Sequence, residues 1–132
     1  MWGINTDTLL GAGGDVHIFG REGDDAIDGG TGADRIDGGS GSDTLSGGSG
    51  ADWFVGSVLG GGATDIITDF EATGGDVIDL SSYFATLDEV VDATEDLGDG
   101  SILITLPIGM GGGGVQVLDA TIDDLTATPT SM

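Results

Sequence analysis

The sequence predicts an all-β solenoid built from short stacked rows and closed by a capping region. Starting at Trp2, six consecutive nine-residue rows can be written, and the sixth ends at Val55. One row cannot bury an apolar side chain by itself, so rows of this kind stack on one another. The eighth position is always large and apolar: Leu9, Ile18, Ile27, Ile36, Leu45 and Phe54. The sixth position is acidic in all rows but one: Asp7, Val16, Asp25, Asp34, Asp43 and Asp52.

Each row reads as a six-residue turn followed by a three-residue strand. Glycines supply the positive-φ positions of a tight turn, and the eighth residue is the inward member of the strand, because strand side chains alternate between faces. Two rows complete one coil, so acidic residues eighteen positions apart lie roughly 4.8 Å apart along one edge. Such a column of like charges opposes folding unless a hard cation such as Ca²⁺ binds between the turns.

The amino-acid composition excludes several classes of function and structure. The 132 residues include 24 Asp and Glu against two Lys and Arg, which gives a net charge of −22 at pH 7, and there is no cysteine. This charge repels nucleic acid and anionic membranes, and the lack of cysteine excludes disulfides and thiolate sites. No apolar window approaches the length of a transmembrane helix, so we expect no membrane insertion. A hydrophobic content of 38% in a regular pattern argues against disorder.

The six rows, residues 2–55, resemble the RTX (haemolysin-type) calcium-binding nonapeptide repeat. Rows four to six match G-G-x-G-x-D-x-U-x, with U a large apolar residue, at every position. The resemblance implies a parallel β-roll, a right-handed β-solenoid in which several Ca²⁺ ions lie between turns on the same edge. In that family the earlier turn provides its second and fourth carbonyl groups and its Asp. The later turn provides its first and third carbonyl groups and its Asp.

Transferred to this chain, the resemblance implies the following ligand sets. Rows one and three join Gly3, Asn5 and Asp7 to Gly20, Glu22 and Asp25. Rows three and five join Arg21, Gly23 and Asp25 to Gly38, Ser40 and Asp43. Rows four and six join Gly30, Gly32 and Asp34 to Gly47, Ser49 and Asp52. A last site joins Gly39, Gly41 and Asp43 to Asp65, with Asp69 as a further candidate. Row two offers Val16 instead of Asp, so its site with Gly29, Thr31 and Asp34 is expected to be weak or empty unless Asp15 substitutes.

The remainder of the chain predicts a degenerate last row, residues 56–68, and a β-rich capping region, residues 69–132. The motif Asp-x-Ile-x-Asp-Phe, formed by Asp65, Ile67, Asp69 and Phe70, resembles the segment that commonly follows RTX repeats in type I secretion substrates. Alternating apolar residues predict strands within 65–70, 76–80, 101–106 and 114–119. A short amphipathic helix is predicted over 83–97, and one helical turn over 121–125.

We expect a non-catalytic protein. The single histidine, His17, has no partner for a zinc site or a triad, and a chain without lysine has no Walker motif. For Trp53, packing under the cap is favoured over a binding platform. The favoured function is an extracellular Ca²⁺-binding module that folds after bacterial type I secretion. The alternatives are a self-assembling filament or surface-layer subunit, stacking through an uncapped start near Leu10 and Phe19, and the tail of an exported hydrolase with an upstream domain.

Overall fold

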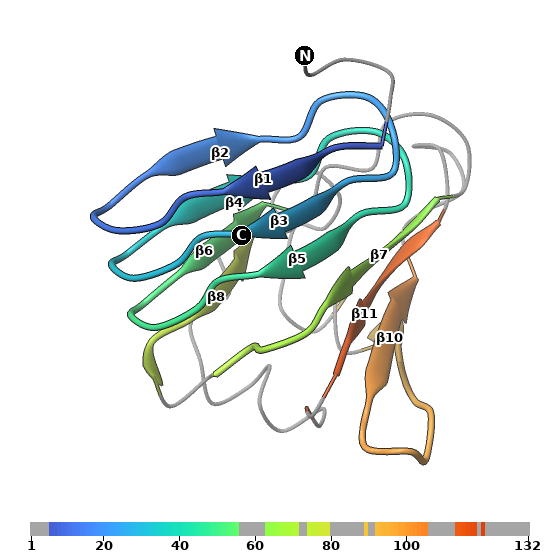
Figure 1. Ribbon diagram of the computed structural model, residues 1–132. Coiled ribbons are helices and arrows are strands. Elements are labelled where there is room, and N and C mark those ends of the chain that lie inside the picture. Colours follow the sequence, from blue (N-terminus) through green and yellow to red (C-terminus); the bar gives the residue numbers. More distant parts are fainter. Residues whose placement is uncertain are drawn as a thin grey trace.

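The chain forms two β-sheets, and its first eight strands alternate between them along the sequence (Figure 1). The computed structural model describes residues 6–55, 63–71, 74–79, 89, 92–105, 113–118 and 120. One sheet has seven strands in the order β1-β3-β5-β7-β11-β10-β9, and the other has four in the order β2-β4-β6-β8. Within the six repeat rows the chain crosses from one sheet to the other at every turn, so two rows make one coil of the solenoid, as the repeat predicts.

The strands of the six rows occupy the seventh to ninth positions of each row. These strands pair in parallel with one another, and partners along both stacks of rows are eighteen residues apart, for example Leu9 with Ile27 and Ile36 with Phe54. The predicted turn–strand division and the predicted coil length are therefore confirmed. The six strands are β1 (Thr8–Leu10), β2 (His17–Phe19), β3 (Ala26–Asp28), β4 (Arg35–Asp37), β5 (Thr44–Ser46) and β6 (Trp53–Val55).

The apolar core is a thin column between the two sheets. The eighth-position side chains fill it, with Ile36 fully buried and Leu45 and Phe54 almost so. Ile18 is only half-buried and lies in β2, at the outer end of the four-stranded sheet. Each row contributes one side chain to the core, so the stability of the roll depends on the number of coils that stack.

Two further strands extend the roll beyond the six regular rows. β7 (Thr64–Ile67) pairs with β5, and β8 (Val77–Asp79) pairs with β6, both in parallel. The eighteen-residue spacing between paired residues is lost at this point. Thr44 pairs with Ile66, which lies twenty-two residues later. Ile67 and Ile78 continue the buried column of the repeat rows.

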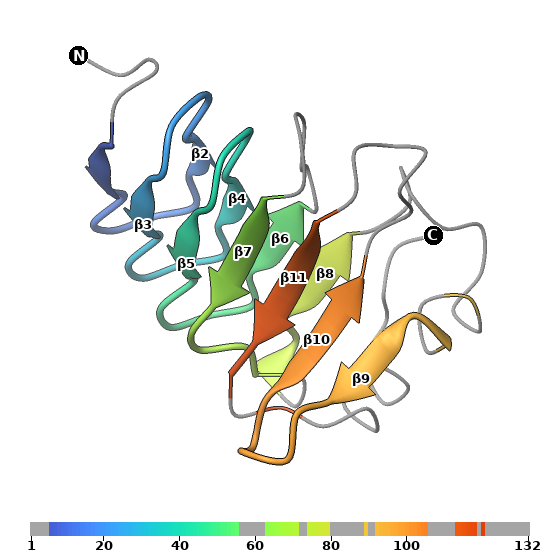
Figure 2. The same ribbon diagram turned by 90° about the vertical axis from the view of Figure 1, so that its right-hand side faces the viewer.

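The seven-stranded sheet then continues with cap strands (Figure 2). β11 (Gly114–Val117) pairs in parallel with β7, and β10 (Ile102–Thr105) lies antiparallel to β11. β9 (Thr94–Asp96) is antiparallel to β10 and ends the sheet. The predicted strands within 101–106 and 114–119 are thus present, and the predicted turn over 121–125 lies outside the described residues.

The helix predicted over 83–97 is wrong in its last part. Glu89 and Asp92 are helical, but Thr94–Asp96 form strand β9 instead. Pairing with β10 overrides helix propensity there, because the positive-φ residues Gly98 and Gly100 turn the chain back into a hairpin. Residues 83–88, 90 and 91 lie outside the described part. Within the described part no helix has the length and apolar character needed to cross a bilayer.

Candidate metal centre

The sixth-position aspartates form two hydrogen-bonded columns, one on each edge of the roll. We call the edge with the turns of rows three and five the odd-row edge, and the edge with those of rows two, four and six the even-row edge. On each edge, the Oδ1 atom of an Asp accepts the backbone N–H of the sixth residue one coil earlier. On the odd-row edge the donor–acceptor pairs are Asp7–Asp25, Asp25–Asp43 and Asp43–Asp65, at 2.8–2.9 Å. On the even-row edge they are Val16–Asp34, Asp34–Asp52 and Asp52–Asp76, at 2.8–3.0 Å.

The second carboxylate oxygen of four of these residues has no hydrogen-bond partner. The Oδ2 atoms of Asp25, Asp34, Asp43 and Asp52 are buried and unpaired, in residues no more than 2% exposed. A buried ionised oxygen without a partner is strongly unfavourable, so these atoms indicate a missing positive ligand. Each Oδ2 lies against the first glycine of its own row, where an added Cβ would come within 3 Å of it.

Burial raises the pKa of several carboxyl groups in the two columns, and neighbouring negative charges add to the effect. Burial, followed by the charges of Asp65, Asp25 and Asp24, raises the pKa of Asp43 to about 8. Burial also raises the pKa of Asp65 to about 7 and that of Asp52 to about 6, and it raises the pKa of Asp25. Without a metal ion, Asp43 and Asp65 on the odd-row edge therefore hold protons near neutral pH, and a divalent cation that stabilises the ionised forms would displace these protons.

Backbone carbonyl groups complete the oxygen donor set. The second-position carbonyl groups point at the next turn of the same edge, where Arg21 O accepts from Ser40 N at 2.8 Å and Gly30 O accepts from Ser49 N at 3.0 Å. Each carbonyl oxygen keeps a second lone pair for another ligand. The third positions of neighbouring turns are paired as Glu22 with Ser40 and Thr31 with Ser49.

Carboxylate and carbonyl oxygens on successive turns are the donors that a hard cation such as Ca²⁺ binds. Among the described residues, no three acidic or imidazole side chains form a metal-binding group by themselves. Backbone carbonyl groups of the same turns are the further oxygen donors that the resemblance implies.

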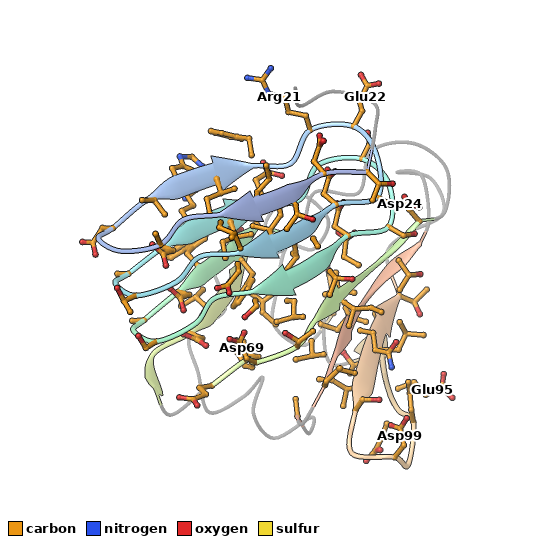
Figure 3. All side chains as sticks on the ribbon, viewed as in Figure 1. Arg21, Glu22, Asp24, Asp69, Glu95 and Asp99 are labelled. Atoms are coloured by element: carbon orange, nitrogen blue, oxygen red, sulfur yellow. The ribbon has the colours of Figure 1, made fainter. Side chains whose placement is uncertain are left out.

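The expected ligands near the start of the roll are described only in part. Gly3 and Asn5 lie outside the described residues, and Asp7 is half-buried with its N–H bound to Asp25. The side chains of Arg21 and Glu22 project outward from the odd-row edge (Figure 3). Arg21 has a φ of 75°, where glycine is usual, which is consistent with a role for its backbone rather than its side chain.

Row two lacks one carboxylate of its metal site. Val16 fills the acidic position, and its Cγ2 lies against Gly11 in the way that an Asp Oδ2 lies against the first glycine of rows three to six. Asp15 contacts the next turn at the fifth position instead, because its Oδ1 accepts the N–H of Ala33 at 2.8 Å, as Asp24 Oδ1 accepts that of Ser42. Asp34 is thus the one sixth-position carboxylate that these two rows provide, and the weak or empty site expected there stays a prediction.

The even-row column ends at a residue that the sequence analysis missed, Asp76. Its Oδ1 accepts from Asp52 N and its Oδ2 from Glu71 N, both at 2.8 Å. The turn before it is closed locally, with Gly74 N and Asp76 N both donating to Glu71 O. The spelling of residues 76–79, Asp-Val-Ile-Asp, fits the D-x-U-x end of a row and was the available signal. Both oxygens of Asp76 are thus satisfied without a metal ion.

Trp53 lies on the outer face of the four-stranded sheet. The Arg35 guanidinium stands over its ring at 5.8 Å, and its indole N–H donates to Asp79 Oδ2 at 3.3 Å. A groove of about 420 Å³ passes beside it, and His17, Ala33 and Ala51 are among its lining residues. The contact with Asp79 accords with a packing role, and the groove leaves one side of the ring accessible.

Comparison with known proteins agrees with this geometry. The family model for the RTX calcium-binding nonapeptide repeat matches residues 3–36 and 28–58. The chain is similar to the solution structure of the AlgE6R3 subunit of the mannuronan C5-epimerase from Azotobacter vinelandii, with 28% identity and a TM-score of 0.65. The similarity covers 96% of this chain and 76% of that one. A search of curated proteins gives no match.

The fold and the acidic columns define a calcium-binding β-roll. Residues 3–58 match the model for the RTX calcium-binding nonapeptide repeat, as the sequence predicts, and the predicted parallel β-roll fold is confirmed.

Proposed function

We propose that this chain is an extracellular calcium-dependent folding module, exported by the bacterial type I route and non-catalytic. RTX repeats bind calcium and are typical of secreted proteins, which supports both the cofactor and the location. The order of events is export of an extended chain from a cytoplasm poor in calcium, followed by folding at extracellular calcium concentrations.

One observation carries the proposal: among the described residues, the Oδ2 atoms of four buried aspartates are the buried side-chain polar atoms that have no hydrogen-bond partner. Together with the raised pKa of Asp43, this makes the metal-free roll unstable near neutral pH. Calcium stabilises the folded chain because the unfolded chain has no assembled site.

We assign the ions to the turns that present carboxylates on both sides. The site between rows three and five uses Asp25 and Asp43, and that between rows four and six uses Asp34 and Asp52, each with carbonyl oxygens of both turns. Asp43 and Asp65 offer a third pair, and rows one and three a fourth. The complete proposed carbonyl set for the two central sites is Arg21, Gly23, Gly38, Ser40, Gly30, Gly32, Gly47 and Ser49.

The test is a calcium titration starting in chelator, followed by far-UV circular dichroism and light scattering in the same cell. A cooperative gain of β-structure at constant particle size is expected. A chain that is already folded in chelator, and that calcium does not stabilise further, would contradict the proposal.

A second candidate is a filament or surface layer formed by head-to-tail stacking. It is favoured by the apolar start of the roll, where Leu10 is 72% and Phe19 is 49% exposed. Both side chains line a hollow of about 240 Å³ that is formed along β1 and β2, the outermost strands of the two sheets. If calcium raises light scattering in parallel with the β signal, this candidate is preferred; a monomer at saturating calcium excludes it.

The similarity to a repeat subunit of a polysaccharide-modifying enzyme supports a third possibility for the context of the module. In this case the chain is an accessory part of an exported enzyme whose catalytic domain lies upstream. The calcium chemistry proposed above is unchanged, because a catalytic partner would use the roll as a folding and positioning unit.

A further inference from the structure

In two turns of the roll, a carboxylate holds the peptide group that carries a proposed metal ligand. Asp28 Oδ1 accepts Gly30 N at 2.9 Å, and Asp37 Oδ1 accepts Gly39 N at 3.0 Å. In both cases the acid is the last residue of a strand, and the donor is the second glycine of the following turn. The peptide plane that contains this N–H also contains the carbonyl group of the first glycine, which is the proposed ligand.

The turn of row six has no acid at that place. The last residue of β5 is Ser46, and the carboxylate is provided instead by Asp69, more than twenty residues further along the chain. Asp69 Oδ1 accepts Gly47 N at 2.9 Å, and Asp69 Oδ2 accepts Gly48 N and Ser46 Oγ, both at 2.8 Å. Both oxygens of this half-buried side chain are therefore engaged by the turn (Figure 3).

The planarity of the peptide determines what this contact does to the ligand. In a trans peptide the C=O and N–H bonds point in opposite directions, so a carboxylate bound to Gly48 N fixes the direction of the Gly47 carbonyl. That oxygen faces the turn of row four, where a Cβ added to Gly29 would be 2.8 Å from it. The negative charge at the N–H also polarises the peptide and increases the electron density on the carbonyl oxygen.

We propose that Asp69 is a positioning residue for the metal site between rows four and six, rather than a ligand, and that it connects the capping region to that site. The inference rests on the calcium function proposed above. It replaces the expectation that Asp69 binds metal directly, because its two oxygens already accept three donors. The last even-row site then reaches full affinity only after the segment that carries Asp69 has docked on the turn.

The experiment follows Tb³⁺ bound in place of Ca²⁺ by its emission after excitation of Trp53, the neighbour of Asp52. Trp2→Phe is introduced throughout, because Trp2 and Trp53 are the two tryptophans of the chain. In this background Asp69→Ala is compared with Ser46→Asp/Asp69→Ala, which places a carboxylate where Asp28 and Asp37 stand in their own turns. Asp99→Ala is the matched control, because Asp99 holds a cap turn through Ser101 N and Oγ at a distance from this site (Figure 3).

Asp69→Ala is expected to weaken Trp53-sensitised Tb³⁺ binding about tenfold, which corresponds to about 1.4 kcal/mol. The added Ser46→Asp substitution is expected to recover most of this loss, and Asp99→Ala to leave the affinity unchanged. A structural role alone predicts no such recovery. Unchanged affinity in Asp69→Ala, or no recovery with Ser46→Asp when the β signal is complete, overturns the inference. If the parent protein itself neither binds Tb³⁺ nor gains β-structure with calcium, the proposed function fails instead.

Discussion

The metal-free roll should fold when it is acidified. The pKa values of Asp43, Asp65 and Asp52 are raised to about 8, 7 and 6, against an ordinary value of 3.8. A carboxyl group with a raised folded-state pKa contributes full stability below its unfolded pKa and loses it as the pH rises through the folded value. For these three groups the loss extends from about pH 4 to pH 8.

The size of the effect follows from those values. One pH unit of difference corresponds to about 1.4 kcal/mol, so at pH 8 the three groups together oppose folding by on the order of 10 kcal/mol. That is comparable with the whole stability of a small domain. At pH 5 about two-fifths of this unfavourable free energy remains, so acidification recovers several kcal/mol of stability without any metal ion.

The assay is far-UV circular dichroism and thermal unfolding of protein freed of calcium and kept in chelator, between pH 8 and pH 5, with light scattering to exclude precipitation. Asp43→Asn keeps the acceptor for Asp25 N but removes the charge, so it should fold in chelator at a higher pH than the parent. Asp99→Asn alters an exposed carboxylate and should leave the midpoint unchanged. A β signal that is constant or falls on acidification would refute the reasoning.

Three further predictions concern the repeat itself. Val16→Asp should add one bound calcium ion, measured by titration calorimetry or native mass spectrometry, whereas Val16→Asn should add none. Ile36→Ala removes a fully buried side chain and should lower the unfolding free energy in calcium by about 2–5 kcal/mol in a denaturant titration. Gly39→Ala should disrupt the odd-row edge and reduce the calcium-induced β signal, because its Cβ would overlap the Arg21 carbonyl oxygen. Gly98→Ala shares the positive φ but meets no atom within 4 Å, so it should cost only about 1–2 kcal/mol; an equal loss in both variants would contradict the steric argument.

The repeat rows were predictable from the sequence because their determinants are local and periodic. A strict nine-residue period specifies where the turns occur, which side chain faces inward and which residues stack eighteen positions later. The pairing of Leu9 with Ile27 and the burial of Asp25 follow from that period. The gap at Val16 was equally visible, since a valine has the shape of an aspartate but no oxygen.

The sequence predicts the structure less well where the nine-residue period breaks. Asp76 was missed because its turn closes locally around Glu71 and no longer spells the glycine pattern. The helix predicted over 83–97 was too long, because strand pairing with β10 outweighs the local preference of Thr94–Asp96.

The sequence by itself therefore determined the roll, its core column and the two acidic edges, since each depends on contacts repeated at a constant separation. Only the tertiary structure decided that β11, and not β10, pairs with β7. It also decided that Asp69 contacts the turn at Gly47. Both contacts join segments at separations that no period encodes. The four unpaired Oδ2 atoms were likewise visible only in the tertiary structure. An atom can be identified as unpaired only when all the groups that pack around it are known.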